Sequence, residues 1–156
     1  MQKLPLLFQF KQLVRGNGFT AGVQMHGRSI LDESEGDVWI TGVAPSSFAG
    51  GGVDRAAAFV EFRKAWVEIL FDIAQEAASF DDFERECQSF LSESAEVVAE
   101  EWSTLLGELR SQKITDATLP SQKAEENPVR FDVSDLTNLQ LADQNVSEAP
   151  LQQLAA

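Results

Sequence analysis

The side chains of this sequence that could do chemistry are few. The chain has one histidine, His26, one cysteine, Cys87, and no tyrosine, so a general base cannot be paired with a nucleophile with any specificity. Cys87 lies between Phe83 and Phe90 on an expected apolar helix stripe, which indicates a small core side chain. His26 falls on a polar strand face, where a solvated role is favoured and a catalytic or nucleic-acid role is the alternative. That face also carries Thr20, Gln24 and Arg28.

The acidic residues do not form a recognisable metal site. Asp81 and Asp82 are adjacent, so on a helix they would point about 100° apart. Glu93, Glu96 and Glu100 have a spacing that places carboxylates on one helix face. Without histidine or a second carboxylate cluster they are interpreted as a solvated face. We therefore expect no metal, no cofactor and no enzymatic activity.

The triplet Gly50-Gly51-Gly52 precedes an expected helix, where backbone N–H groups could bind a phosphate. The triplet lacks the spacing and the lysine of a phosphate-binding loop, and Asp54 places a negative charge where the phosphate would lie. We interpret it as a flexible connection between a strand and a helix, because glycine adopts backbone angles that other residues resist.

Composition narrows the class of protein further. The chain has 156 residues and a single cysteine, which excludes a disulfide framework. No apolar run approaches the roughly 18 residues that cross a bilayer, and Met1–Phe10 does not resemble a signal peptide, so we expect a cytoplasmic protein away from membranes. With 25 acidic against 12 basic residues, the net charge of −13 disfavours direct nucleic-acid binding.

The first third of the chain predicts three antiparallel strands. Leu6–Lys11 alternates with a period of two, as a strand does. Gly16-Asn17-Gly18 favours a tight two-residue hairpin turn into a second strand over Phe19–Leu31. A polar turn then precedes Val38–Val43, which is rich in β-branched and aromatic residues. Such a sheet, with one polar face, needs a helix to cover its other face.

Helical patterns occupy the middle of the chain. Asp54 is a suitable N-cap for a long helix whose apolar stripe runs over 58–77. Ser79 begins a second helix with a capping-box pattern. A third apolar seam is too short for a coiled coil and is expected to pack on the domain or on a partner. The seam consists of Ala95, Val98, Trp102, Leu105 and Leu109.

The expected fold class is α+β, a three-stranded antiparallel sheet covered by one long amphipathic helix, with further helices and an extended tail. The expected parts are an α+β domain over 1–92, a helical extension over 93–112 and an acidic tail over 113–156. The tail is expected to be extended or disordered, and within it only 129–133 could form a short strand.

The order of elements over Leu6–Ala77 resembles the HicB-like antitoxin domain, a small partial RNase H-like fold. The matching stretch is a third strand, Val38–Pro45, a loop that reaches Gly52, and the first helical turns over Val53–Phe59. The resemblance implies an oligomeric, non-catalytic protein that neutralises a small basic ribonuclease toxin, such as a HicA-like toxin, by occupying its active site. The chain shows no DNA-binding segment of the kind that many members carry, so operator binding is not expected.

Charge distribution agrees with a basic protein partner. Residues 53–110 contain 14 acids and five bases, a net charge of −9, which suits steering towards a basic surface. We expect Glu61, Glu68 and Asp72 to contact that partner. Two alternatives stay open: the charge serves only solubility, or the chain is a ligand-binding or enzymatic domain that uses the polar sheet face and the glycine triplet.

Self-association is also expected. A three-stranded sheet leaves two edges unpaired, and no sheet face is expected to remain for the apolar seam. We predict a homodimer that forms through an edge strand, through the seam, or through both. The seam residues assigned to this contact are Val98, Trp102, Leu105 and Leu109.

Overall fold

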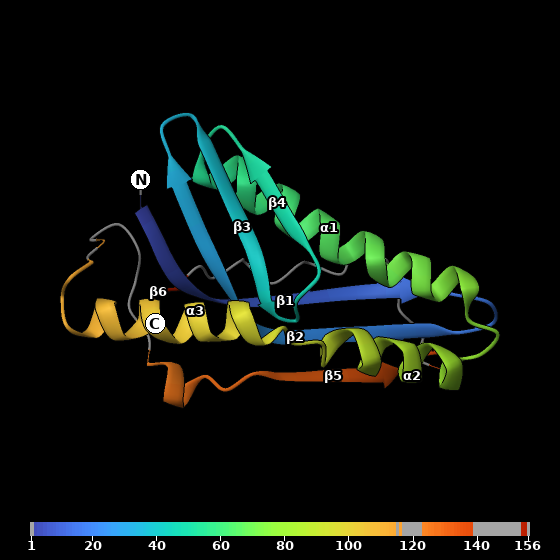
Figure 1. The fold of residues 1–156 in the computed structure, drawn as a ribbon. Helices are drawn as coiled ribbons and strands as arrows, with labels where there is room; N and C mark the ends of the chain where they lie inside the picture. The colour runs from blue at the N-terminus through green and yellow to red at the C-terminus, as the bar shows by residue number, and fades with distance from the viewer. Residues whose placement is uncertain (1, 115, 117–122, 139–153, 156) are drawn as a thin grey trace.

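Two long antiparallel strands form the centre of the fold in the computed structural model (Figure 1). The structure describes residues 2–114, 116, 123–138 and 154–155. The strand order is β4-β3-β2-β1-β6, and β5 also pairs with β2. The strands are β1 (Gln2–Arg15), β2 (Thr20–Ser34), β3 (Asp37–Ala44), β4 (Ala49–Gly52), β5 (Arg130–Asp135) and β6 (Leu154–Ala155). The helices are α1 (Arg55–Glu76), α2 (Phe80–Leu91) and α3 (Glu96–Arg110), with a short 3-10 turn at Ala124–Glu126.

The α+β class and the antiparallel arrangement of β1, β2 and β3 are confirmed. The first hairpin has the predicted two-residue turn, because the Gly16 N–H donates a hydrogen bond to the Phe19 carbonyl (3.0 Å) across Asn17 and Gly18, and Arg15 and Thr20 form the next pair of the ladder. The side-chain amide of Asn17 donates hydrogen bonds to the carbonyls of Ala77 (3.0 Å) and Gln75 (3.4 Å). The hairpin tip is therefore fastened to the end of α1 and not shaped by local turn preferences alone.

One edge of β2 is divided between two strands. β3 pairs with its second half, from Arg28 to Ser34, and β5 pairs with its first half, from Ala21 to His26. The register shifts between Arg28 and Ser29, and the sheet bends in this region (Figure 1). The short strand that was possible at 129–133 is present as β5, and it belongs to the sheet because it pairs with β2. Residues 115, 117–122, 139–153 and 156 of the expected tail lie outside the described residues.

The long predicted helix is confirmed as α1, and it packs on one face of the sheet. The Asp54 carboxylate accepts a hydrogen bond from the Ala57 backbone N–H (2.7 Å), which caps the first turn. Phe62 and Trp66 of α1 are fully buried against Phe10 of β1. Ser79 caps α2, as predicted, because its hydroxyl oxygen accepts a hydrogen bond from the Asp82 backbone N–H (3.3 Å). Burial of this aromatic cluster is the main reason for α1 to lie on the sheet.

The glycine triplet is not a flexible connection, because it belongs to strand β4. Gly50, Gly51 and Gly52 pair with Ile40, Trp39 and Val38 of β3. A Cβ atom on Gly50 would lie only 2.0 Å from the backbone nitrogen of Phe62. The absence of side chains therefore lets α1 cross the edge of the sheet at backbone contact distance.

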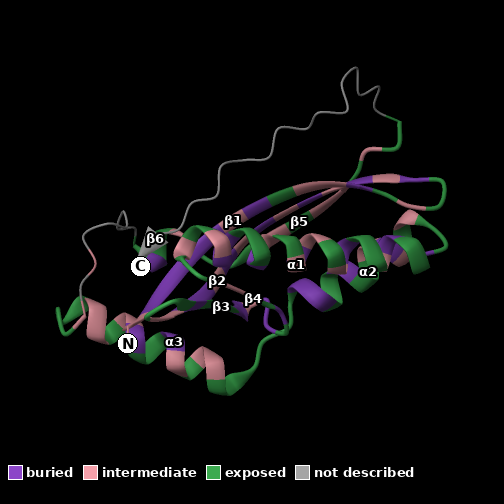
Figure 2. Cartoon of the chain, turned by 90° about the horizontal axis from the view of Figure 1, so that it is seen from above, coloured by how far each residue is buried: buried purple, intermediate pink, exposed green. Residues whose placement is uncertain are grey.

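The second face of the sheet is covered as well, by α3 (Figure 2). This face was predicted to be polar, but in the half of the sheet that contains β3 it is apolar. Trp102 and Leu105 of α3 form a second buried cluster there. The sheet contributes Leu7, Ile30 and Val43 to this cluster. The region predicted as a helical extension thus packs on the same sheet as the preceding residues.

Candidate functional site

The three acids assigned to partner binding lie along the outer side of α1. Glu61, Glu68 and Asp72 are separated by seven and four residues, so at 3.6 residues per turn they fall within about 40° of each other around the helix. All three are exposed. The structure therefore brings them into one acidic row, as their helical spacing indicates, and their role in binding stays a prediction.

Two exposed apolar side chains adjoin this acidic row, and sequence reasoning missed them. Val60 is 60% exposed and Phe71 is 47% exposed. They are eleven residues apart, which is about 16 Å along a helix, and they face a direction roughly 80–100° from the centre of the acidic row. The sequence could have indicated their exposure, because neither residue belongs to the apolar stripe of α1 that packs on the sheet. We call the exposed set Val60, Glu61, Lys64, Glu68, Phe71 and Asp72 the α1 outer surface.

The apolar seam lies mainly inside the chain. Trp102 is 2% exposed and Leu105 is 7% exposed, and Val98 packs at the border of the same cluster. Leu109 is half-buried near the end of α3. The indole N–H of Trp102 donates to the backbone carbonyl of Leu6 (3.4 Å). These residues were predicted to form a dimer interface because no sheet face was expected to remain for them. That premise is wrong, because Trp102 and Leu105 pack on the second face of the sheet.

The polar strand face around His26 does not assemble a catalytic pair among the described residues. The His26 Nε2 atom lies 3.4 Å from Arg130 Nη2 on the adjacent strand β5. Burial, and then the positive charges of Arg130 and Lys11, lower the pKa of His26. The imidazole is therefore neutral at pH 7 and faces a cation instead of a nucleophile.

Cys87 is buried in the main core, as its place on the apolar stripe of α2 indicates. Burial, with a smaller contribution from the charge of Glu86, raises the pKa of its thiol to about 12. A thiol with this pKa is protonated at neutral pH and is a poor nucleophile. The prediction of a small core side chain is confirmed.

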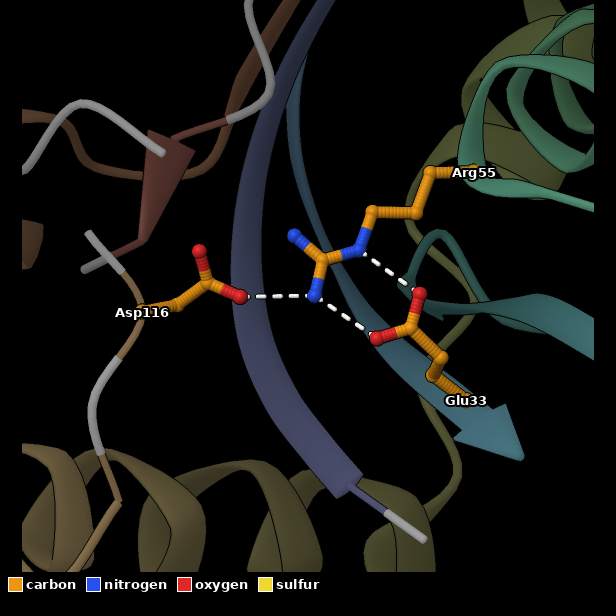
Figure 3. Close-up of polar contacts among 3 residues, drawn as sticks. All are labelled: Glu33, Arg55 and Asp116. Carbon is orange, nitrogen blue, oxygen red and sulfur yellow. Dashed lines mark hydrogen bonds and ion pairs between the residues drawn. The ribbon is translucent and has the colours of Figure 1, made fainter. Parts of the chain in front are cut away.

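An ion cluster joins three distant parts of the chain (Figure 3). Arg55 donates to both carboxylate oxygens of Glu33, at 2.9 and 2.7 Å, and to Asp116 at 2.6 Å. The hydrogen bond from Arg55 is the main cause of the lowered pKa of Glu33. The bidentate geometry is the strongest arrangement available to an arginine and a carboxylate. The cluster fastens the start of α1 to the end of β2 and to the segment after α3, and sequence reasoning did not identify it.

The described residues contain no cluster of three His, Cys, Asp or Glu side chains that could hold a metal ion. Glu93, Glu96 and Glu100 are exposed. None of the described helices combines the length and the apolar character that a bilayer crossing requires. Comparisons of the chain with protein-family models, characterised proteins and solved structures give no match.

Proposed function

We propose that this chain is a non-catalytic module that binds a basic protein through the α1 outer surface. The observation that carries the proposal is the acidic row of Glu61, Glu68 and Asp72 beside the exposed Val60 and Phe71. Acidic groups at the rim of a contact accelerate encounter with a basic protein. Exposed aromatic and aliphatic side chains supply the apolar anchors that most contacts of this kind need.

The charge of the neighbouring elements supports the same class of partner. Residues 53–110, which contain the three helices, carry a net charge of −9, while residues 1–52 carry four acids and four bases. Asp81 and Glu86 of α2 are also exposed and add acidic groups to the helical part of the chain. In the form implied by the HicB-like resemblance, the partner is a small basic ribonuclease toxin whose active site this chain occupies.

Charge reversal tests the proposal. The partner is isolated from native cells with the intact chain, and association is then followed kinetically with purified components. Glu61→Lys, Glu68→Lys and Asp72→Lys together are expected to slow association at least tenfold with a smaller effect on dissociation, since long-range steering acts on the encounter. High salt is expected to remove most of the difference, because at about 1 M the Debye length falls to about 3 Å.

The matched control carries the same change in charge elsewhere. Glu93 is exposed in the loop before α3, and Glu96 and Glu100 are exposed in the first turns of α3. Reversal of these three charges is expected to leave the association rate nearly unchanged. Phe71→Ala is expected to act instead on dissociation, because an apolar anchor holds the formed complex. The proposal is contradicted if binding of the partner depends neither on salt, nor on the triple charge reversal of α1, nor on Phe71→Ala. Substrate turnover that is lost on changing His26 would favour the enzymatic alternative.

Self-association is proposed through an edge of the sheet. In the described part of the chain, the outer edge of β1 pairs only at Leu6 and Leu7, with β6. Between Phe8 and Arg15 the carbonyls of Lys11 and Leu13 accept hydrogen bonds from the side chains of Arg63 and Gln12, and we propose that other backbone groups of this edge pair with a second copy. Light scattering at micromolar concentration is expected to give about twice the chain mass of 17.2 kDa. A mass of one chain that does not rise with concentration would exclude this dimer.

A further inference from the structure

A cavity of about 380 Å³ lies where β3 and β5 separate along the edge of β2. Its volume falls within the usual range for sites that hold small molecules. Its walls come from five elements: β2, the end of β3, the end of α2 with the following loop, α3, and the start of β5. The side chains important here are Arg28, Val43, Glu93, Trp102, Ser103 and Phe131.

Arg28 provides an unusual positive charge in this cavity. Its Nε atom is buried and has no hydrogen-bond partner among the described residues, and no described carboxylate forms a salt bridge with it. Burial lowers the pKa of Arg28, and Glu125 is the carboxylate that acts in the opposite direction. Glu125 is itself bound to Arg110. A buried polar group without a partner is costly, and among the described residues no carboxylate is bound to this partly buried guanidinium to compensate that cost.

Trp102 positions the guanidinium. The central carbon of the Arg28 guanidinium lies 4.4 Å from the centroid of the Trp102 ring, within the range of a cation–π contact. The hydrogen bond from the indole N–H to the Leu6 carbonyl holds the ring in place. Stacking occupies one face of the guanidinium, and Nε is enclosed by the protein, so the two Nη groups are left to bind an anion. A planar fork of this kind matches a carboxylate in a bidentate manner.

We propose that this cavity binds a small organic monocarboxylate, with its carboxylate on Arg28 and its apolar body against Trp102, Phe131 and Val43. The apolar walls favour a ligand with a hydrocarbon or aromatic part. Glu93 also lines the cavity, and its charge disfavours a second negative charge, so phosphate esters and dicarboxylates fit poorly. The proposal does not depend on the protein-binding function, because the cavity and the α1 outer surface share no residue.

The test compares an arylalkyl carboxylate with a neutral alcohol of the same carbon skeleton and with an anion that has no apolar part. The full chain is titrated with 3-phenylpropanoate, with the neutral 3-phenylpropan-1-ol and with inorganic phosphate, and the indole N–H resonance of Trp102 is followed by NMR after assignment with Trp102→Phe. The carboxylate is expected to shift this resonance and to bind at least about tenfold more tightly than the alcohol or phosphate. Absence of a shift up to about 10 mM carboxylate, or equal binding of the alcohol, overturns the proposal.

Two substitutions and a control complete the test. Arg28→Gln keeps the side-chain stem and is expected to weaken carboxylate binding at least about tenfold. Arg28→Lys keeps the charge without the fork, and is expected to bind more weakly than the native chain but still to prefer the carboxylate over the alcohol. The control, Arg85→Gln, changes an exposed arginine of α2 and is expected to bind as the native chain does. Unchanged carboxylate binding in both Arg28 variants overturns the proposal. If Arg28→Gln does not fold, the result with Arg28→Lys decides the test.

Discussion

Replacement of Trp66 by alanine is expected to lower the free energy of unfolding by about 3 to 5 kcal/mol. Trp66 is fully buried in the centre of α1 and its ring centroid lies 5.2 Å from that of Phe10 on β1. The substitution removes the largest side chain of the core and leaves a cavity that the surrounding aromatic rings cannot close. Urea unfolding followed by circular dichroism measures this change in the free energy of unfolding. A loss below about 1 kcal/mol would show that packing of the α1 stripe contributes little to the stability of the core.

Trp66→Phe is the matched control for this prediction. The buried indole N–H of Trp66 has no hydrogen-bond partner among the described residues, so its removal costs no hydrogen bond and relieves an unsatisfied donor. Phenylalanine retains most of the aromatic contact with Phe10. We expect a loss below about 1.5 kcal/mol. A phenylalanine variant as unstable as the alanine variant would contradict this account, because it would mean that the N–H group is satisfied and important.

Replacement of Gly50 by alanine is expected to cost about 3 kcal/mol, through overpacking instead of a cavity. The added Cβ would lie 2.0 Å from the backbone nitrogen and 2.5 Å from the Cα atom of Phe62. These are backbone atoms, so no side-chain rotation relieves the contact. Helix α1 would have to move away from β4 and would loosen the stacking of Phe62 on Phe48. Equilibrium unfolding in urea measures this loss.

The same substitution at Gly107 is expected to have the opposite sign. Gly107 lies within α3 and is exposed, and an added Cβ would meet no atom within 4 Å. Alanine stabilises a helix interior relative to glycine by about 0.5 to 1 kcal/mol. Equal effects at the two positions would show that the close approach of α1 to β4 does not determine the cost at Gly50.

The sequence was informative wherever a single periodicity decided the structure. The alternation around Phe8 and Phe10 predicts β1, and the helical recurrence of Phe59, Phe62 and Trp66 predicts α1, because each pattern continues over several turns or pleats. The acidic row of α1 could be predicted for the same reason. Its members share a helix face whatever the tertiary structure is.

The parts that sequence reasoning missed depend on contacts between distant segments. Leu7 and Ile30 stand next to residues of the main core, Leu6 and Leu31, in their own strands. Only the pairing of β1, β2 and β3 gathers them with Val43 into a second apolar face for Trp102. The glycine triplet has low strand propensity. It lies in β4 because only residues without a side chain fit between β3 and the closely packed α1.

The polar clusters were missed for a related reason. Arg55 reaches Asp116 across 61 residues of chain, and no local pattern indicates that pairing. The cavity at Arg28 likewise requires five separate elements in their final positions. Predictions from periodicity therefore gave the acidic row of α1 but neither of these two sites.

The division of one β2 edge between β3 and β5 has a consequence for synthesis on the ribosome. β3 follows β2 after a turn of two residues, whereas β5 begins only at Arg130. At about 5 to 20 residues per second, nearly a hundred residues take roughly 5 to 20 s to add. During that interval the edge of β2 from Ala21 to His26 is without its strand and offers its backbone groups to any neighbouring nascent chain. The rate of chain elongation between β3 and β5 thus sets how long the β2 edge of each new molecule can pair with a wrong strand.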